Sequence, residues 1–285
     1  MLFATDLDRT IIYSNKFVEN YQTVSCVEHL DGREISYMSH RALELLAQAK
    51  TRCDIHLIPI TTRSLAQFSR IIPLQDCPYA VVANGGIILH KGQPLKVWQE
   101  HIERTRQIQA LDYPKILDIL TKYQKYLTRT PSLVDNLFFF TKVTKDQDIV
   151  QEFILPSLEK DLKDLEWTFT LQGLKLYIIP KEISKENALS FLKDYLKEEF
   201  LITSGDGKLD AGFLSLGDIK MIPKNSEVYQ LINNKDGYMI VKSDESENII
   251  HLSEIATVIF ENTAINITAY LLCELANNKV KIIFC

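Results

Sequence analysis

The first residues of this chain that could do chemistry are two carboxylates near its N-terminus. Asp6 and Asp8 stand two residues apart, and the hydroxyl of Thr10 follows two residues later. Carboxylate oxygens are ligands for a hard cation such as Mg²⁺, and a carboxylate can also attack phosphorus as a nucleophile. The same pattern arises where a strand simply ends in a turn with solvated charge. Support for a functional role of this pair must therefore come from partner residues elsewhere in the chain.

The segment that must position this pair is the apolar run directly before it. Residues 2–5, with the sequence Leu-Phe-Ala-Thr, predict a short buried strand. In an open α/β sheet, ligands collect just beyond the carboxyl ends of the strands. We therefore expect Asp6 and Asp8 to project into a crevice at that edge of a sheet.

Three further polar clusters stand where predicted strands end or predicted helices begin. They contain Thr61 and Thr62 after a strand over residues 54–60, Lys185 at the start of a helix over residues 185–196, and Asp206 and Asp210 after a strand over residues 200–203. Phosphoryl transfer requires a nucleophile, an acid or base, a metal ion and donors for the phosphoryl oxygens. The four clusters together contain residue types suited to each of these parts.

The order of the predicted elements indicates an α/β fold. Helix, strand, helix and strand alternate over residues 40–83, and Ser39 and Ser64 are the expected caps of the two helices. This alternation is typical of a parallel sheet with crossover helices. The alternation resumes later, with elements over residues 185–196, 200–203, 219–222 and 238–241 and a mostly helical segment over residues 252–277.

Between these two parts the pattern changes. Residues 87–176 contain a predicted hairpin around Lys91-Gly92, helices over residues 113–127 and 146–162, and strands over residues 136–143, 167–171 and 174–179. Strands and helices grouped in this way indicate a separate α+β module. We therefore predict an α/β fold with a Rossmann-like three-layer core and a mainly parallel sheet over residues 1–86 and 177–285. An α+β cap domain is predicted to be inserted over residues 87–176.

The composition is that of an ordinary soluble globular protein that can bury a sizeable core, with 46% hydrophobic and 24% charged residues. The net charge of −5 argues against non-specific nucleic-acid binding. No apolar segment is long enough to span a bilayer, and five scattered cysteines indicate reduced thiols in a cytoplasm. We expect a cytoplasmic protein with no membrane or nucleic-acid partner, and its oligomeric state stays open.

In order and spacing, the four clusters resemble the four motifs of the haloacid dehalogenase (HAD) superfamily of phosphohydrolases. The segments that carry the resemblance are Asp6-Leu7-Asp8-Arg9-Thr10, Thr61-Thr62-Arg63, Lys185 with its neighbours up to Leu189, and Gly205-Asp206-Gly207-Lys208-Leu209-Asp210. The segment Asn84-Gly85-Gly86 and the place of the insert resemble the subgroup with a large α/β cap. That subgroup includes the Cof-like sugar phosphatases and the sucrose- and trehalose-phosphate phosphatases.

This resemblance, which covers almost the whole chain, implies catalytic and metal-binding roles. Asp6 would be the nucleophile and Asp8 the general acid and base. Mg²⁺ would be bound by Asp6, by Asp8 through its backbone carbonyl, and by Asp206. Asp210 would complete the metal site by orienting a metal-bound water or the lysine.

The resemblance implies phosphate-binding residues in the same way. Thr61 and Lys185 would bind the phosphoryl oxygens, and Asn84 would contact the phosphate or the cap. Two neighbours compete for these roles, because Thr62 is adjacent to Thr61 and Lys181 stands about one helical turn before Lys185.

Two residues depart from the family pattern. Arg9 and Thr62 stand where the first and second motifs usually have glycine, which permits positive φ or a close backbone approach. Arg9 could bind a second anionic group of the substrate, or it could be a surface charge paired with a neighbour, and the pairing is the favoured interpretation.

The resemblance implies a Mg²⁺-dependent phosphatase that hydrolyses a small phosphorylated metabolite, such as a sugar phosphate, through an aspartyl-phosphate. A phosphomutase or other phosphotransferase of the same superfamily is the first alternative. A non-catalytic regulatory module that kept the fold is the second, and the presence of all four motifs weighs against it. The insert would be a mobile lid that sets specificity.

Overall fold

The computed structural model describes residues 1–20, 23–224 and 226–229, and beyond them residues 238–242, 247–251, 257–260, 275 and 280–284. The chain forms two compact units, Met1–Val228 and Tyr229–Cys285. Every residue predicted to belong to the site lies in the first unit.

A parallel sheet forms the centre of the first unit. Its strand order is β14 (Ile219–Met221), β13 (Leu201–Ser204), β1 (Leu2–Thr5) and β5 (His56–Pro59), and all pairs are parallel. Beyond β5, an isolated parallel bridge between Ile60 and Val81 leads to β6 (Tyr79–Val82). The apolar run at the N-terminus is thus the inner strand β1, as predicted, because a strand with neighbours on both sides buries nearly all its side chains.

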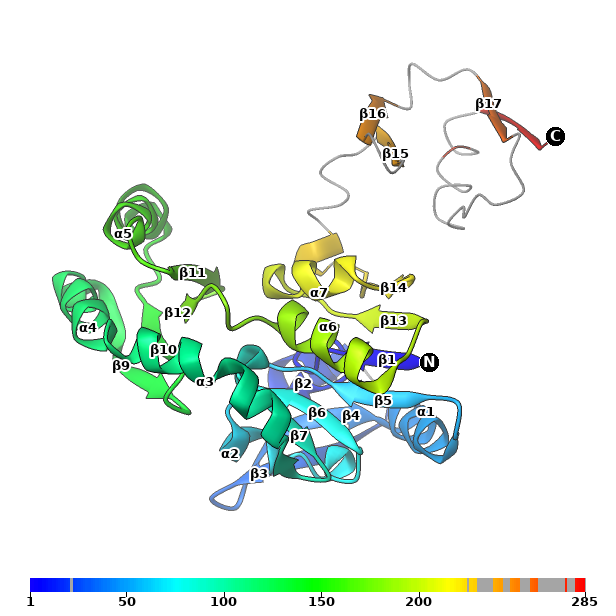
Figure 1. Cartoon of the computed structure of the whole chain (residues 1–285), viewed down its shortest axis with the longest axis horizontal. Coiled ribbons are helices and arrows are strands. Elements are labelled where there is room, and N and C mark those ends of the chain that lie inside the picture. Colours follow the sequence, from blue (N-terminus) through cyan, green and yellow to red (C-terminus); the bar gives the residue numbers. More distant parts are fainter. Residues whose placement is uncertain are drawn as a thin grey trace. The chain divides into compact units, whose positions relative to one another are not determined.

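Helices and a hairpin cover the two faces of this sheet (Figure 1). One face packs against α3 (Lys96–Ala110), α6 (Lys185–Leu196) and α7 (Ala211–Ser215). The other packs against α1 (His40–Thr51), α2 (Leu65–Phe68) and the hairpin of β3 (Val24–Leu30) and β4 (Arg33–Ser39). Successive strand residues point to opposite faces, so Leu2 and Ala4 belong to the first layer and Phe3 to the second. The predicted three-layer α/β core is confirmed.

A second, antiparallel sheet lies within the same unit. Its order is β11 (Trp167–Gln172), β12 (Lys175–Pro180), β10 (Phe138–Val143) and β9 (Leu127–Val134). The helices α4 (Tyr113–Lys122) and α5 (Leu155–Leu162) cover one of its faces around Phe139, Leu176 and Trp167 (Figure 1). This is the α+β module expected from the sequence, and we call its sheet the cap sheet.

The remaining short elements connect these layers. They are the strands β2 (Tyr13–Ser14), β7 (Ile87–His90) and β8 (Gln93–Pro94) and single helical turns or 3-10 segments at Asn15–Asn20, Ile72–Leu74, Ala83–Gly85, Gln124–Tyr126 and Lys208–Asp210. β7 pairs antiparallel with β6, and Trp98 of α3 packs in the same cluster as Leu2. The division between core and cap at residues 87 and 176 stays a prediction.

Several predicted helix boundaries are confirmed, and others differ. The hydroxyls of Ser39, Ser64 and Ser184 each accept a backbone N–H as N-caps. The helix expected over residues 146–162 is π-helical over Ile149–Ile154 before α5, since Pro156 cannot donate to the preceding turn. The hairpin of β3 and β4 and the helix α3 were not predicted.

The second unit contains two described strand pairs. β15 (Tyr238–Lys242), expected as a strand, pairs antiparallel with β16 (Glu247–His251). The helix predicted over residues 252–277 is wrong at β17 (Thr257–Phe260), which pairs parallel with β18 (Lys281–Phe284). The β-branched and aromatic residues of β17 favour a strand. Apart from Leu275, the other residues of that prediction lie outside the described part of the chain.

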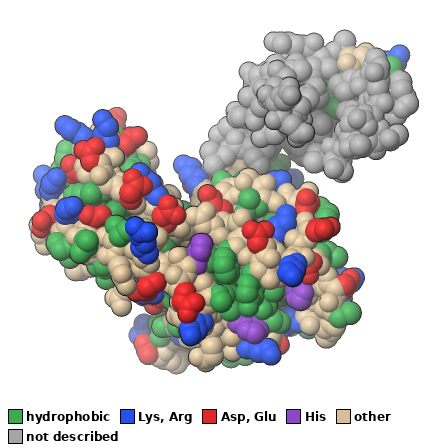
Figure 2. All heavy atoms as spheres, in the orientation of Figure 1, with side chains coloured by type: hydrophobic (Ala, Val, Ile, Leu, Met, Phe, Trp, Pro, Cys, Tyr) green, Lys and Arg blue, Asp and Glu red, His purple; other side chains and the backbone are tan. Residues whose placement is uncertain are grey.

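The described surface shows no sign of a membrane span. Among the helices that the structure describes, none combines the length and the hydropathy needed to cross a bilayer. Figure 2 shows acidic and basic side chains interspersed over the face in view.

A tight turn after β6 fixes where α6 begins. Ala83 and Asn84 have φ of 50° and 56°, and Gly85 has φ of 100°. A Cβ built on Gly85 would overlap the carbonyl oxygen of Ser184, the N-cap of α6. Only glycine permits this approach, which sets the position of the first residue of α6, Lys185.

We predict that Gly85→Ala destabilises the protein by about 2 kcal/mol more than Gly92→Ala does, because only the first adds a steric overlap. Gly92 is the matched control, since its φ is 75° and a Cβ there would meet no atom within 4 Å. Urea-induced unfolding of both variants measures the difference. Equal losses of stability would contradict a close approach at Gly85.

Candidate active site

The C-terminal ends of three neighbouring strands bring the first site residues together. Asp6 directly follows β1, Thr61 follows β5 after one residue, and Asp206 follows β13 after one residue. The backbone N–H of Asp6 donates to the carbonyl of Ser204 at 2.7 Å, so the edges of β1 and β13 are aligned. Parallel strands share this edge, which is where the sequence placed the carboxylates.

Lys185 connects two of these strand ends to α6. Its ammonium donates to Oδ1 of Asp6 and to Oδ1 of Asp210, both at 2.6 Å, and the residue is only 3% exposed. Oδ2 of Asp210 accepts the backbone N–H groups of Asp206 at 3.0 Å and Gly207 at 2.8 Å. The competing Lys181 lies at the surface, 3.7 Å from Glu166.

The side chains of Asp6, Asp206 and Asp210 form a buried carboxylate cluster. One oxygen from each lies within 4.8 Å of the others, and no more than 6% of any of the three residues is exposed. Carboxylate oxygens at this spacing suit a divalent cation such as Mg²⁺. The side chain of Asp8 does not belong to this cluster, and the expected role of its backbone carbonyl as a metal ligand stays a prediction.

The cluster carries more negative charge than its neighbours neutralise. Burial, followed by repulsion from Asp210, raises the pKa of Asp6 to about 8, although Lys185 opposes the shift. Burial also raises the pKa of Asp206 to about 6, with Arg9 opposing and Asp210 adding to the shift. A bound divalent cation would offset this repulsion, so the donor set fits the metal.

Arg9 occupies the backbone conformation that the glycine of the family motif would allow. Its φ is 62°, which is disfavoured by about 1 kcal/mol for a residue with a Cβ. Its Nε lies 3.1 Å from Oδ2 of Asp206. Of the two sequence interpretations, the structure therefore shows pairing with a neighbour, and that neighbour belongs to the carboxylate cluster. Thr62, the other departure, lies outside the left-handed region.

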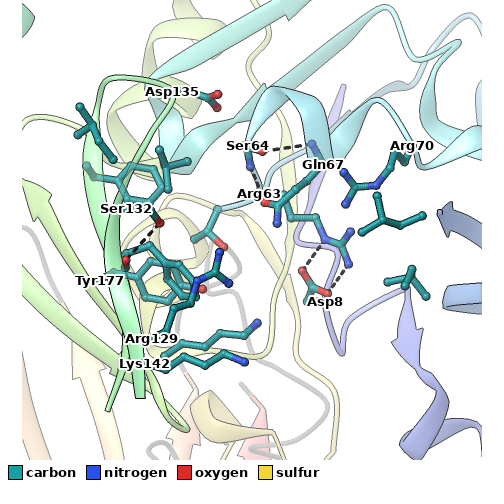
Figure 3. A pocket seen from close by; sticks show the side chains of 18 of the residues that line it. Asp8, Arg63, Ser64, Gln67, Arg70, Arg129, Ser132, Asp135, Lys142 and Tyr177 are labelled. Atoms are coloured by element: carbon teal, nitrogen blue, oxygen red, sulfur yellow. Dashed lines mark hydrogen bonds and ion pairs between the residues drawn. The ribbon is translucent and has the colours of Figure 1, made fainter. Parts of the chain in front are cut away.

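Asp8 points toward Arg63 (Figure 3). Nε and Nη2 of Arg63 donate to its two carboxylate oxygens at 2.9 and 2.8 Å. Partial burial favours protonation, but this bidentate pair outweighs it and holds the pKa of Asp8 below its usual range. The Asp8 side chain is 45% exposed, and it faces a cavity.

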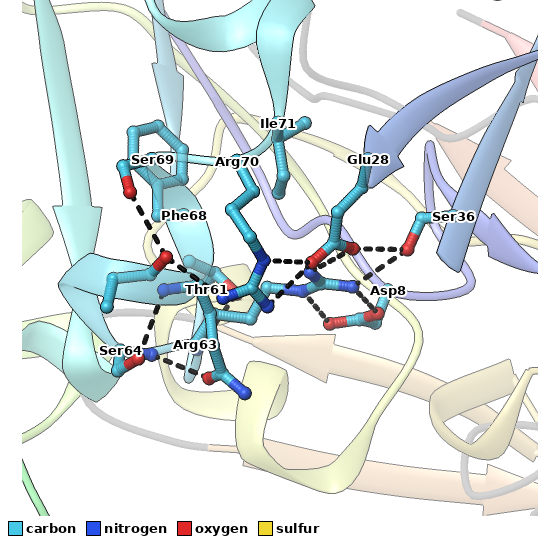
Figure 4. A network of polar contacts seen from close by, with 12 residues as sticks. Asp8, Glu28, Ser36, Thr61, Arg63, Ser64, Phe68, Ser69, Arg70 and Ile71 are labelled. Carbon is cyan, nitrogen blue, oxygen red and sulfur yellow. Dashed lines mark hydrogen bonds and ion pairs between the residues drawn. The ribbon is translucent and has the colours of Figure 1, made fainter. Parts of the chain in front are cut away.

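Arg63 is itself held by Glu28, a residue that the sequence did not indicate (Figure 4). Glu28 is fully buried and accepts from Arg63 at 2.7 Å, from Arg70 at 2.9 Å and from the Ser36 hydroxyl at 2.6 Å. Burial favours its protonated form, but these donors together lower its pKa. The sequence does contain one signal that could have indicated this segment. The pair Asp31-Gly32 is typical of a hairpin turn, which predicts a strand around Glu28.

The two other predicted phosphate-binding residues bind backbone atoms in this structure. The buried hydroxyl of Thr61 accepts the N–H of Arg63 at 3.2 Å, which leaves its own hydrogen available for a phosphoryl oxygen. The Asn84 amide donates to the carbonyl of Ile183 at 3.0 Å, while its Oδ1 has no hydrogen-bond partner. Asn84 and Lys185 line a second cavity of about 210 Å³.

A larger cavity of about 550 Å³ lies beside Asp8. Residues from the core line one side and residues from the cap sheet line the other (Figure 3). The core side contributes Asp8, Thr62, Arg63, Ser64, Gln67 and Arg70, and the cap side contributes Arg129, Ser132, Phe140, Lys142, Lys175 and Tyr177. Figure 3 shows Arg129 and Lys142 extending from the cap sheet into this space.

We predict that Glu28→Gln lowers the free energy of unfolding by about 3 kcal/mol at pH 7, since it leaves two guanidinium groups without their buried anion. Because the pKa of Glu28 is lowered in the folded state, its contribution is present above the ordinary glutamate pKa. It is lost as pH falls through the folded value, so the difference should shrink in acid. Urea unfolding at several pH values measures it, with Glu34→Gln as the exposed control. A loss no larger than in the control would contradict the role of Glu28.

Comparison with known proteins gives a family for the chain. A sequence model described as sucrose-6F-phosphate phosphohydrolase matches residues 1–235. None of the curated proteins is a significant match to the sequence.

Solved structures with the same fold agree with this result. The sucrose-phosphatase of Synechocystis sp., in complex with sucrose and phosphate, is 17% identical, covers 83% of this chain and 87% of its own, and has a TM-score of 0.56. The HAD subclass IIB sugar phosphatase BT4131 is 11% identical and has a TM-score of 0.51, and the match covers 80% of this chain and 88% of that protein. The C-terminal domain of C. albicans trehalose-6-phosphate phosphatase is 14% identical and has a TM-score of 0.50, and the match covers 75% of this chain and 72% of that domain.

At these identities the structural matches show the fold, and the family follows from the match over residues 1–235. The order of the four motifs and the cap sheet agree with it. The chain therefore belongs to the sucrose-6F-phosphate phosphohydrolase family of the HAD superfamily, and is a phosphoric monoester hydrolase.

Proposed function

We propose that the protein is a Mg²⁺-dependent phosphatase that hydrolyses a sugar phosphate through an aspartyl-phosphate intermediate. The observation that carries the proposal is the buried Asp6, bonded to Lys185 and placed beside Asp206 and Asp210. The family description and the sucrose and phosphate bound to the Synechocystis enzyme support a sugar phosphate as the substrate.

The carboxylate cluster supplies the nucleophile and the metal ligands in this proposal. Asp6, Asp206 and Asp210, with the backbone carbonyl of Asp8, are the groups that would hold Mg²⁺. The ion would offset the charge of both the cluster and the phosphate. An oxygen of Asp6 attacks phosphorus, the bond to the sugar oxygen breaks, and the phosphoryl group is left on Asp6.

Lys185 and Thr61 stabilise the charge on the phosphoryl oxygens. The ammonium of Lys185 is already desolvated and fixed by two carboxylates, so it needs little reorganisation to meet the substrate. The free hydrogen of the Thr61 hydroxyl is a second donor at the same edge of the sheet. Asn84 supports the proposal indirectly, because it holds the carbonyl of Ile183 just before α6.

Asp8 moves the protons. Arg63 keeps its carboxylate ionised, which suits removal of a proton from the water that hydrolyses the aspartyl-phosphate. The same carboxyl, once protonated, returns a proton to the leaving sugar oxygen in the next turnover. The pair with Arg63 therefore fixes the direction of Asp8 and biases it toward the base form.

We predict that Asp6→Asn lowers turnover of p-nitrophenyl phosphate and of sugar phosphates by at least about 10³-fold, because an amide is a poor nucleophile. EDTA should abolish the activity of the wild type, and added Mg²⁺ should restore it. Asp76→Asn, at an exposed aspartate, is the control. Activity that survives EDTA would exclude the metal role. Release of inorganic phosphate, rather than transfer to a second sugar, separates a phosphatase from a phosphomutase.

We predict that Lys185→Met lowers kcat by roughly 10²- to 10³-fold, as for loss of a preorganised donor. It should also lower the melting temperature, because Asp6 and Asp210 lose their shared cation. Protonation can relieve that repulsion, so the loss of stability should be larger at pH 8 than at pH 6. Lys181→Met is the control for both measurements. If Lys181→Met instead removes activity, the assignment of the lysine is wrong.

A further inference from the structure

Three basic side chains form one row across the cap sheet. Lys142 of β10 lies opposite Lys175 of β12 on one side and opposite Arg129 of β9 on the other. All three residues are exposed, and all three line the cavity that Asp8 faces. Like charges directly opposite each other on neighbouring strands destabilise a sheet. An anion bound in the cavity beside these three side chains would offset their repulsion.

No carboxylate of the described residues forms an ion pair with this row. The acidic residues that line the cavity are Asp8, Glu28 and Asp135. Asp8 is bound by Arg63, Glu28 is bound by Arg63 and Arg70, and Asp135 accepts the N–H of Leu65 at 2.9 Å. The hydrogen bonds of these three carboxylates are thus made on the core side, and the row has no ion-pair partner among them, although the charge of Lys175 helps to lower the pKa of Asp8.

The next row on the same face of the sheet is aromatic. Phe140 lies opposite Tyr177 on β12 and Ser132 on β9. The guanidinium of Arg129 lies 5.0 Å from the centre of the Phe140 ring, which holds the cation at the wall of the cavity. An apolar surface beside cations suits a ligand with a ring and an anionic substituent.

We propose that Arg129, Lys142 and Lys175 bind a second anionic group, a carboxylate or a phosphate, on the substrate. The proposal rests on the proposed function and narrows its substrate class to sugar phosphates that carry another negative group. The reacting phosphoryl group lies at Asp6, the ring packs near Phe140 and Tyr177, and the second anion meets the cationic row.

Binding to the Asp6→Asn variant tests the row without turnover. The probes are glucose 6-phosphate, glucuronic acid 1-phosphate and glucose 1,6-bisphosphate, which all have a sugar ring, and binding is measured by calorimetry with Mg²⁺ on the full chain. At least one of the two probes that carry a second anionic group should bind at least about tenfold more tightly than glucose 6-phosphate, as for an added charge-assisted contact. The tighter of the two tells whether the second group is a carboxylate or a phosphate.

Lys142→Met and Lys175→Met, each added to Asp6→Asn, should weaken binding of the tighter probe about tenfold more than they weaken binding of glucose 6-phosphate. Lys125→Met, at an exposed cap lysine that does not line the cavity, should not change this ratio. Both test variants should keep or raise the melting temperature, since each removes a like-charge contact. Equal affinity for all three probes, or equal weakening of all three by Lys142→Met, would overturn the proposal. Wild-type hydrolysis of p-nitrophenyl phosphate is assayed separately, and its absence refutes the proposed function whatever the binding result.

Discussion

The bridge that Lys185 makes between two buried carboxylates is the interaction on which the rest of the site depends. Asp6 follows the inner strand of the sheet, Asp210 lies in the turn after β13, and Lys185 begins α6. Removing three charges from water is unfavourable unless they compensate one another with good geometry. The tight turn at Gly85 and the Ser184 cap place the start of α6 where the ammonium meets both oxygens. The electrostatics of the site therefore depend on the packing of the core, because that packing places the ammonium of Lys185 between the two carboxylates.

A second set of charges, centred on Arg63, separates Asp8 from this bridge. Glu28 and Asp8 share the guanidinium of Arg63, and Glu28 also binds Arg70. The first network concentrates negative charge where a divalent cation could bind, whereas the second holds the carboxylate of Asp8 at the wall of the cavity. Asp6 and Asp8 belong to different hydrogen-bond networks, and their pKa values shift in opposite directions although they stand only two residues apart in sequence.

Much of the fold could be predicted because local signals and tertiary packing agree. The strand before Asp6, the caps Ser39, Ser64 and Ser184, and the α+β character of the insert all came from short-range patterns. The helix α3 escaped prediction because it has no side-chain cap and buries few residues, with only Trp98, Ile102 and Gln109 covered. The strand β17 was missed because its short apolar run fits a buried helix as well as a strand. Its parallel partner β18 lies more than twenty residues away.

The sequence by itself determined that Asp6, Thr61 and Asp206 stand at one edge of the sheet, since each follows a parallel strand, and that Lys185 begins a helix. It could not decide where the Asp8 side chain points, because that depends on Arg63 and on Glu28 in a hairpin thirty-five residues away from Arg63. Nor could it reveal the row of Arg129, Lys142 and Lys175, which exists only through strand register. A one-residue shift would turn these side chains to the other face. Long-range pairing and side-chain direction are set by packing, which local sequence patterns do not encode.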